Sequence, residues 1–376
     1  MILAIDGYEA NADARVGVGR YALELLTHIY ARVEAGNTPF DSVRVYVPDA
    51  PKPHMPKRTS RWHYVLRKPK NFWTFWALPM ALQADMPQAD VVFSPTHYIP
   101  RFVSVPKVMA IMDVSYLLYP ELFRPQDLHK LIHGTAYSVS HARTIITISE
   151  FSKNAIIEAY HVPKDRIVVA YPALSDSVDT KKSMGKKSTL TSLPKRYILS
   201  VGTIQPRKNY VRLIEAFSAL PDRDISLVIV GKKGWLYEDI LTAPNRCGVS
   251  GRVQFLDFVP DDALPALYER AEFFALPSLY EGFGLPVLEA MAHGTPVVVS
   301  KTSSLPEIAG KSGIYVDPSD TKSIADGLLQ AIREKGTKEE SARIALGKKL
   351  AKQFTWDKAA DTVLDVLSYV GRGGNA

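Results

Sequence analysis

The strongest constraint on the fold is a series of short apolar runs, each followed by a longer segment of helical character. The runs are rich in Val, Ile and Leu and show no regular alternation with polar residues. Strands of this kind are buried on both faces of a parallel sheet and are joined by helices. In the first half of the chain the runs cover residues 2–5, 43–47, 91–93, 108–111, 144–148 and 167–170.

The second half repeats this pattern. There the runs cover residues 197–201, 226–230, 253–256, 273–276, 296–300 and 313–316. About twelve strands are more than one open, twisted sheet holds comfortably. We therefore predict an α/β protein with two parallel sheets, each the centre of a Rossmann-like domain.

The boundary between the two domains is predicted from composition. Residues 175–194 contain four lysines, five serines and a glycine, which is typical of an exposed linker. We expect an N-terminal domain over residues 1–175, a linker over 176–194, a C-terminal domain over 195–355, and a last helix with its tail over 356–376.

The most informative motif follows the predicted strand 273–276. Pro286 suits the first position of a helix, and Gly294 suits the position that ends one. The first backbone N–H groups of that helix, aided by its dipole, would form an anion site. Glu281 and Glu289 flank this site, and because carboxylates repel phosphate, they are suited to accept hydrogen bonds from hydroxyls. The motif indicates a ligand with both phosphate and sugar hydroxyls.

A second cluster follows the predicted strand 197–201, where the loop carries Gly202, Arg207 and Lys208. Open α/β sheets bind ligands at the carboxyl ends of their strands. A guanidinium and an ammonium group there could neutralise a diphosphate leaving group without a metal ion. Taken alone, the two cations could equally be solvated loop residues.

These motifs together resemble those of family 4 retaining glycosyltransferases of the GT-B fold, the glycosyl transferases of group 1. The resemblance spans nearly the whole chain. It is carried by the pair Glu281 and Glu289, and by the segments Gly202 to Asn209, Ser304 to Gly310, Gly313 to Pro318, Gly17 to Tyr21, Ile148 to Ser152 and Phe354 to Trp356. It implies two Rossmann-like domains that face a central cleft, with the helix after Trp356 crossing back to the N-terminal domain.

The resemblance also implies roles for the candidate residues. Arg207 and Lys208 would hold the donor diphosphate, and Glu289 would bind the ribose hydroxyls. Glu281 would grip the transferred sugar, and Gly17 would face the phosphates from the other domain. The predicted catalytic residues are Glu281, Arg207, Lys208 and Asp113. The predicted donor-binding residues are Gly17, Gly202, Gly231, Val259, Phe283, Gly284, Leu285 and Glu289, with the base against Gly231 and the backbone of Phe258 and Val259.

The implied reaction transfers a hexose from a nucleotide-diphosphate sugar, GDP-mannose or a UDP-hexose, to a glycan or lipid-linked acceptor. The acceptor should contact the N-terminal domain, and intermediates of cell-envelope or surface polysaccharides are the expected class. Retention is generally thought to use the departing phosphate as the base. We expect no metal site and no cofactor besides the donor sugar.

One position departs from the family pattern. The family often has a His-Asp pair after the fourth strand, where this chain has Met112 and Asp113. Methionine can neither donate a strong hydrogen bond nor transfer a proton. Asp113 could assume part of that role or could cap the next segment. His97, in a neighbouring loop, could be a substitute or a structural residue, so His97 and Met112 are assigned to the acceptor side.

Three other interpretations follow from the sequence. The methionine leaves open a catalytically impaired subunit that binds nucleotide sugars or a partner protein. The segment from Gly17 to Ala22 also matches a dinucleotide-binding fingerprint, but it lies too far from the first strand and lacks the acid expected ~20 residues later. A nucleic-acid binder is disfavoured because the basic surplus is local and no recognition motif accompanies it.

The net charge of +7 comes from one part of the chain, residues 50–84. This stretch contains no acid and seven basic residues, so the remainder balances at 39 against 39. It also contains Trp62, Trp73 and Trp76. Cations beside aromatic rings suit an anionic membrane surface or a lipid-phosphate acceptor. The alternative is a helix that starts near Phe72 and packs in the core, with solvated cations around it.

The expected location is the cytoplasm, at the inner face of the membrane if residues 50–84 bind lipid. The single cysteine, Cys247, suits a reducing compartment. The first residues lack the basic start of a signal peptide. No apolar run reaches the ~18 residues that a membrane-spanning helix needs.

Overall fold

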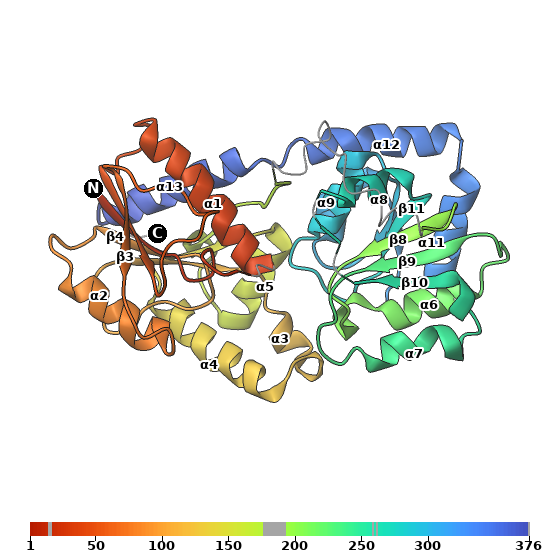
Figure 1. The fold of residues 1–376 in the computed structure, drawn as a ribbon, viewed down its shortest axis with the longest axis horizontal. Coiled ribbons are helices and arrows are strands. Elements are labelled where there is room, and N and C mark those ends of the chain that lie inside the picture. Colours follow the sequence, from red (N-terminus) through yellow and green to blue (C-terminus); the bar gives the residue numbers. More distant parts are fainter. Residues whose placement is uncertain (14–16, 176–192, 258, 261, 375–376) are drawn as a thin grey trace. The chain divides into compact units, whose positions relative to one another are not determined.

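A computed structural model describes residues 1–13, 17–175, 193–257, 259–260 and 262–374 (Figure 1). The chain divides into two compact units. Unit 1 comprises Met1–Leu118, Pro125–Pro172 and Thr355–Ala376, and unit 2 comprises Tyr119–Arg124 and Ala173–Phe354. Residues 176–192 of the predicted linker lie outside the described part of the chain.

Unit 1 contains a seven-stranded parallel sheet with the strand order β3-β2-β1-β4-β5-β6-β7. Its strands are β1 (Ile2–Asp6), β2 (Ser42–Val47), β3 (Trp62–Leu66), β4 (Val91–Ser94), β5 (Lys107–Ile111), β6 (Thr144–Thr147) and β7 (Ile167–Val169). The chain builds β1 to β3 toward one edge and then returns to place β4 on the other side of β1. The topological switch point of this sheet therefore lies between β1 and β4.

The edge strand β3 was not among the predicted strands. Its sequence, Trp-His-Tyr-Val-Leu, is mixed, and the stretch was interpreted only as basic and aromatic. β3 pairs with β2 alone in this sheet and leaves Leu66 exposed. An edge strand with one exposed flank does not need the continuous apolar sequence of a central strand. Its aromatic and β-branched content was the signal that could have identified it.

The helices of unit 1 are α1 (Gly17–Glu34), α2 (Leu78–Ala84), α3 (Ser115–Leu118), α4 (Pro125–His141), α5 (Glu150–Tyr160) and α13 (Trp356–Gly371), with a π-helical turn, η1 (Trp73–Ala77), before α2. The last helix, α13, packs on α1, as the resemblance implied (Figure 1). The Trp356 ring lies 5.7 Å from the Tyr21 ring. Arg32 on α1 donates to Asp357 and Asp361 on α13, each at 2.8 Å. The predicted return of the C-terminal helix to the N-terminal domain is confirmed.

Unit 2 contains a six-stranded parallel sheet with the order β10-β9-β8-β11-β12-β13. Its strands are β8 (Tyr197–Val201), β9 (Ser226–Val230), β10 (Val253–Leu256), β11 (Phe273–Leu276), β12 (Val297–Ser300) and β13 (Gly313–Val316). Its helices are α6 (Tyr210–Ser218), α7 (Glu238–Arg246), α8 (Leu264–Arg270), α9 (Leu285–His293), α10 (Leu305–Ala309), α11 (Thr321–Glu334) and α12 (Lys338–Ala351). The switch point of this second sheet lies between β8 and β11.

Tyr119–Arg124 groups with unit 2 although the residues on both sides of it belong to unit 1. Its contacts are aromatic: the Phe123 ring lies 5.9 Å from the Trp235 ring, and the Tyr119 ring lies 6.1 Å from the Tyr280 ring. The indole of Trp235 also donates a hydrogen bond to the carbonyl of Leu122. The sequence of so short a segment gave no indication that it belongs to unit 2.

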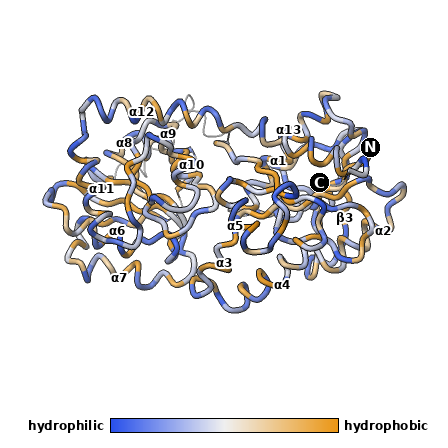
Figure 2. The backbone as a smooth tube through the Cα atoms, turned by 180° about the vertical axis from the view of Figure 1, so that it is seen from behind, coloured by the Kyte–Doolittle hydropathy of each residue, from blue (hydrophilic) through white to orange (hydrophobic). Residues whose placement is uncertain are grey.

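The strands form the interior of each unit, as their apolar sequences predicted. Strands β5, β6, β8 and β9 are buried along almost their whole length, and the outer turns of helices such as α12 are largely hydrophilic (Figure 2). The fold class predicted from the sequence, two Rossmann-like domains with parallel sheets, is confirmed. Within the described residues, no helix combines the length and apolar character needed to cross a membrane.

Candidate functional site

The loops that follow β8 and β11 bring Arg207, Lys208 and Glu281 together at the switch point of the second sheet. Lys208 Nζ lies 2.7 Å from Glu281 Oε1, and Arg207 Nη1 lies 3.2 Å from Glu281 Oε2. Arg207 Nη1 also donates to the carbonyl of Tyr280. We call these three side chains the Glu281 cluster. The loops after β8 and after β11, which the sequence singled out separately, therefore meet in one buried group of charges.

The two cations set the charge state of Glu281. Burial by itself would raise the pKa of this carboxyl group, because it disfavours the charged form. The charges of Lys208 and Arg207, and the hydrogen bond from Lys208, outweigh burial and lower the pKa to about 2. Glu281 is therefore a carboxylate at neutral pH, and the cluster carries a formal charge of 2 − 1 = +1.

Asn209 holds the loop after β8 in place. Its backbone is in the left-handed region, with φ at 61°. Its side-chain Nδ2 donates to the carbonyls of Pro277 at 2.8 Å and Pro318 at 2.7 Å. A further bond joins the amide of Leu279 to the carbonyl of Arg207 at 2.9 Å. The loop with the two cations is thereby tied to the loop with the carboxylate.

Two predicted donor-binding glycines shape the same loop by close approach. A Cβ on Gly202 would lie 3.0 Å from Lys208 Cε, so this glycine makes room for the lysine side chain. A Cβ on Gly231 would lie 2.0 Å from the carbonyl oxygen of Gly202, a distance that no real contact allows. The structure thus gives Gly231 a positioning role. Its predicted contact with a nucleotide base stays a prediction.

The helix predicted to start at Pro286 is α9, which begins one residue earlier, at Leu285. Gly284 is the N-cap residue with φ at 107°, a conformation that favours glycine. The hydroxyl of Ser304 lies 2.9 Å from the carbonyl oxygen of Glu281 and 2.7 Å from that of Phe283. This serine ties the loop before α9 to the segment before α10, and it was not identified as a site residue from the sequence.

Glu289 lies inside α9 and is buried. Its Oε2 accepts a hydrogen bond of 2.8 Å from the hydroxyl of Tyr268, which stacks on the imidazole of His293. The sequence analysis did not single out Tyr268, because a tyrosine in a helix carries no local signal of its partner. Val259 is also buried, and Phe258, predicted to lie beside the base, is outside the described residues.

The remaining candidates belong to unit 1. Gly17 begins α1 with φ at 27° and is exposed. Met112 is buried, and its carbonyl accepts a hydrogen bond of 3.0 Å from the hydroxyl of Ser152. Asp113 Oδ1 accepts from both the amide and the hydroxyl of Ser115 at the start of α3, so the capping interpretation describes its contacts.

His97 lies near Asp113. Burial lowers the pKa of its imidazole, and the charge of Asp113 opposes that effect. The ring packs edge-on against Tyr116, with 6.1 Å between the ring centroids. Its Nδ1 is buried and has no hydrogen-bond partner within the described residues. These contacts suit either interpretation of His97, as a substitute for the missing histidine or as a structural residue.

Comparison with known proteins identifies the family. A family model described as "Glycosyl transferases group 1" matches residues 184–349. The O-antigen chain mannosyltransferase B of Escherichia coli is 33% identical over 282 residues, which are 73% of this chain and 73% of that protein.

Solved structures share the fold at lower identity. Sucrose-phosphate synthase from Thermosynechococcus elongatus matches with a TM-score of 0.73 at 15% identity, over 99% of this chain and 100% of that chain. Anabaena Alr3699/HepE, solved in complex with UDP and glucose, matches with a TM-score of 0.71 at 21% identity, over 98% and 99%. Together with the two parallel sheets, these matches assign the GT-B fold. The similarity to the E. coli mannosyltransferase, which extends over 73% of both chains, shows that the protein belongs to the glycosyl transferases of group 1 and is a glycosyltransferase.

Proposed function

We propose that the protein is a retaining, metal-independent hexosyltransferase of family 4. It transfers a sugar from a nucleotide-diphosphate donor, GDP-mannose or a UDP-hexose, to a glycan or lipid-linked acceptor. The observation that carries this proposal is the Glu281 cluster at the switch point of the second sheet, where open α/β proteins bind ligands.

The charges of this cluster favour a diphosphate. A buried ion pair costs desolvation energy, and a second buried cation against one carboxylate costs more. An anionic ligand offsets that cost because it shares both cations. The N-terminus of α9, which follows Glu281 in the chain, adds its dipole. Arg207 and Lys208 would neutralise the departing diphosphate without a metal ion, and the phosphate oxygen would act as the base on the retained face.

The carboxylates account for the sugar part of the donor. Arg207 and Lys208 fix the orientation of Glu281, so its oxygens can accept hydrogen bonds from hexose hydroxyls. Glu289, oriented by Tyr268, is assigned the ribose hydroxyls. The mannosyltransferase activity in the name of the E. coli relative favours mannose as the transferred sugar. That relative also favours an acceptor from surface polysaccharide biosynthesis.

A donor panel tests this assignment. GDP-mannose, UDP-glucose and UDP-GlcNAc are added to the purified protein, and the shift in Tm is measured together with slow donor hydrolysis. A donor at a hundred times its Kd should raise the stability of the folded protein by about 2.7 kcal/mol. Lys208→Ala should weaken donor binding ten- to a hundredfold, because charged hydrogen bonds contribute about 1.5–3 kcal/mol. If no nucleotide sugar binds or turns over, the enzyme proposal is wrong.

The second candidate function is a catalytically impaired subunit that binds nucleotide sugars or a partner. It rests on Met112, which replaces the usual histidine and is held by Ser152 in a buried position. The donor panel separates the two functions: binding without hydrolysis or transfer would favour the impaired subunit. The complete Glu281 cluster argues only against a pure partner subunit, because such a scaffold has no need of these buried charges.

We also propose that unit 1 binds an anionic membrane surface through residues 50–84 and the adjoining loop. The structure divides the aromatic residues of this stretch. Trp73 is buried in the core, whereas Phe72, Trp76 and Met80 are 70%, 64% and 64% exposed. Phe102 joins them at 84% exposure, and the four side chains line one groove. Large exposed apolar residues beside exposed cations suit an anionic lipid surface.

Vesicle binding tests the membrane contact. The double change Trp76→Ser and Phe102→Ser should reduce binding to vesicles of phosphatidylcholine and phosphatidylglycerol at least tenfold, because burial of one such ring contributes about 1.5–3 kcal/mol. Tyr369→Ser, at a 53% exposed ring on α13, is the matched control. Equal binding by the double variant and the wild type would exclude this surface, as would equal binding to vesicles without anionic lipid.

A further inference from the structure

Unit 1 has a cavity of about 480 Å³ at the amino ends of three neighbouring strands, β5, β6 and β7. Lys107 is the first residue of β5, and Arg143 and Arg166 directly precede β6 and β7. The loop before β5 and the end of α4 complete the lining. None of these residues was assigned a function from the sequence.

The backbone holds the three cationic residues next to one another. The amide of Arg143 donates to the carbonyl of Lys107 at 2.8 Å, and Arg166 Nε donates to the carbonyl of Arg143 at 3.5 Å. Neighbouring strands lie about 4.8 Å apart, and like charges opposite one another on adjacent strands are destabilising. The fold therefore gathers three positive charges at one place, against their mutual repulsion.

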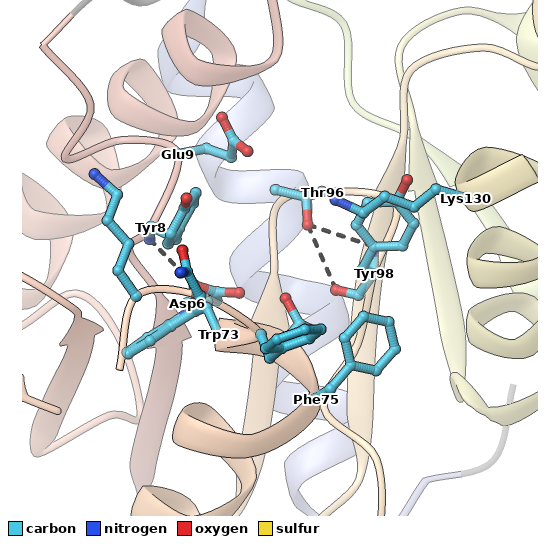
Figure 3. A pocket seen from close by; sticks show the side chains of 12 residues that line it. Asp6, Tyr8, Glu9, Trp73, Phe75, Thr96, Tyr98 and Lys130 are labelled. Atoms are coloured by element: carbon cyan, nitrogen blue, oxygen red, sulfur yellow. Dashed lines mark hydrogen bonds between the residues drawn. The ribbon is translucent and has the colours of Figure 1, made fainter. Parts of the chain in front are cut away.

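The described lining of this cavity contains no acid. With His141 counted as neutral, three cations and no carboxylate give a formal charge of 3 − 0 = +3. The cavity at the carboxyl end of the same sheet differs, because two acids, Asp6 and Glu9, line it together with two lysines, Lys70 and Lys130 (Figure 3). The charge at the amino end is thus not balanced by the residues that line the cavity.

The hydrogen bonds of two of the cations go to neutral groups. Lys107 Nζ donates to the carbonyls of Val103 at 2.7 Å and Val105 at 3.4 Å. Arg166 Nη2 donates to two carbonyls at the end of α4 and just after it. Carbonyl groups accept these bonds but carry no formal charge. Within the residues that the structure describes, one N–H of Lys107 and the Nη1 group of Arg166 have no partner, so both can bind a ligand.

The environment of Lys107 shows the missing negative charge. Burial lowers the pKa of its ammonium group, and the charge of Arg143 lowers it further. Both effects disfavour the charged form, and no carboxylate in the described lining offsets them. An anion in the cavity would act in the opposite direction, because it stabilises the ammonium group. The cavity is therefore suited to an anionic ligand.

We propose that this cavity binds a phosphate group, supplied by a soluble anion or by a lipid headgroup. A phosphate monoester carries a charge of about −1.5 to −2 at neutral pH, so it neutralises more of the lining than a carboxylate does. Guanidinium groups pair with two phosphate oxygens at once, and an ammonium group adds a point charge. The inference depends neither on the donor nor on the reaction.

The lipid source is included because of the neighbouring groove. Ser104, which lines the cavity, comes two positions after Phe102, which lines the exposed groove proposed to contact a membrane. A headgroup phosphate could therefore enter the cavity while Phe102 contacts the lipid. A soluble anion needs no such contact, so the two sources can be distinguished by experiment.

Two binding measurements test the proposal on the full chain. Inorganic pyrophosphate is titrated by calorimetry at low ionic strength, and binding to vesicles of phosphatidylcholine with phosphatidic acid is measured by sedimentation. The wild type should bind at least one of them. Lys107→Gln and Arg143→Gln should each weaken that binding about tenfold or more, as expected for loss of a charged hydrogen bond. Glutamine at position 107 keeps an N–H donor for the carbonyls, and Tm shows that each variant is folded.

Lys164→Gln is the matched control, because Lys164 is exposed, lies two positions from Arg166 and does not line the cavity. It should bind like the wild type. Pyrophosphate bound at the Glu281 cluster is recognised by its loss in Lys208→Ala, whereas the binding proposed here should persist in that variant. Binding of pyrophosphate assigns a soluble anion, and binding to the vesicles alone assigns a headgroup.

Three results would overturn the proposal. The first is that the wild type binds neither pyrophosphate nor the vesicles with phosphatidic acid. The second is that Lys107→Gln and Arg143→Gln both bind like the wild type. The third is an equal loss of binding in Lys164→Gln, which would show a general attraction of anions to unit 1 and no specific site.

Discussion

Glu281→Gln is expected to lower the rate of sugar transfer about a hundredfold or more, the usual cost of misplaced reacting groups, without loss of nucleotide affinity. The amide keeps the size of the carboxylate but removes its charge. It can no longer be held by two cations at once, so the contact with the sugar is misaligned. The cluster gains one positive charge, and GDP or UDP should bind equally well or more tightly. Transfer, or slow donor hydrolysis, is compared with nucleotide titrations.

The matched control is Glu272→Gln. Glu272 comes just before β11, whereas Glu281 comes after it. Glu272 also forms ion pairs with two cations, Arg196 at 3.1 Å and Lys335 at 3.4 Å. It lies at the amino end of the sheet, where no ligand is expected, so its variant should retain transfer. If Glu281→Gln loses transfer rate and nucleotide affinity to the same extent, this residue does not act on the sugar.

Gly231→Ala is expected to destabilise unit 2 by about 3 kcal/mol or more and to abolish donor binding. The added Cβ would lie 2.0 Å from the carbonyl oxygen of Gly202, so the loop that carries Arg207 and Lys208 must move. For a unit of this size such a loss lowers Tm by roughly 6–12 °C. Thermal unfolding and nucleotide titration measure both effects.

Gly251→Ala is the control for this change. A Cβ at Gly251 meets nothing within 4 Å, and its backbone is outside the region that favours glycine. We expect a change in stability of less than about 1 kcal/mol, in either direction. If Gly231→Ala unfolds at the same temperature as Gly251→Ala and binds donor normally, the close approach of the two loops does not support the site.

Much of the fold could be predicted because it depends on local sequence. Twelve of the strands are apolar runs that can be buried only in a parallel sheet, and the crossover of the last helix followed from the family resemblance. The exception, Trp62–Leu66, is an edge strand. Its aromatic and β-branched residues are its only local signal, and its place beside β2 depends on the rest of the sheet.

The Glu281 cluster could be anticipated in part. Arg207, Lys208 and Glu281 were selected because they follow predicted strands, and the structure places them within hydrogen-bond distance. The contacts that hold them were not predicted. Asn209, Ser304 and Gly231 were noted only within motifs or as a donor-binding glycine, and each contacts neighbours distant in sequence, of which a single sequence contains no signal.

The interpretation of residues 50–84 depended on tertiary structure. The sequence showed the charge surplus of residues 50–84 but could not divide its aromatic residues between core and surface. Trp73 and Trp76 are three positions apart, yet one bonds to buried Asp6 and the other is exposed. Nothing in the sequence indicated that Asp6 would bond to Trp73.

The sequence by itself determined the fold class and the candidate donor motifs, because burial of a strand and the start of a helix are encoded within a few residues. The family followed from the resemblance of those motifs. Only the tertiary structure decided which charges pair and which rings are exposed. These properties depend on strands that are adjacent in the sheet but far apart in the chain, so their physical cause is the packing of the whole domain.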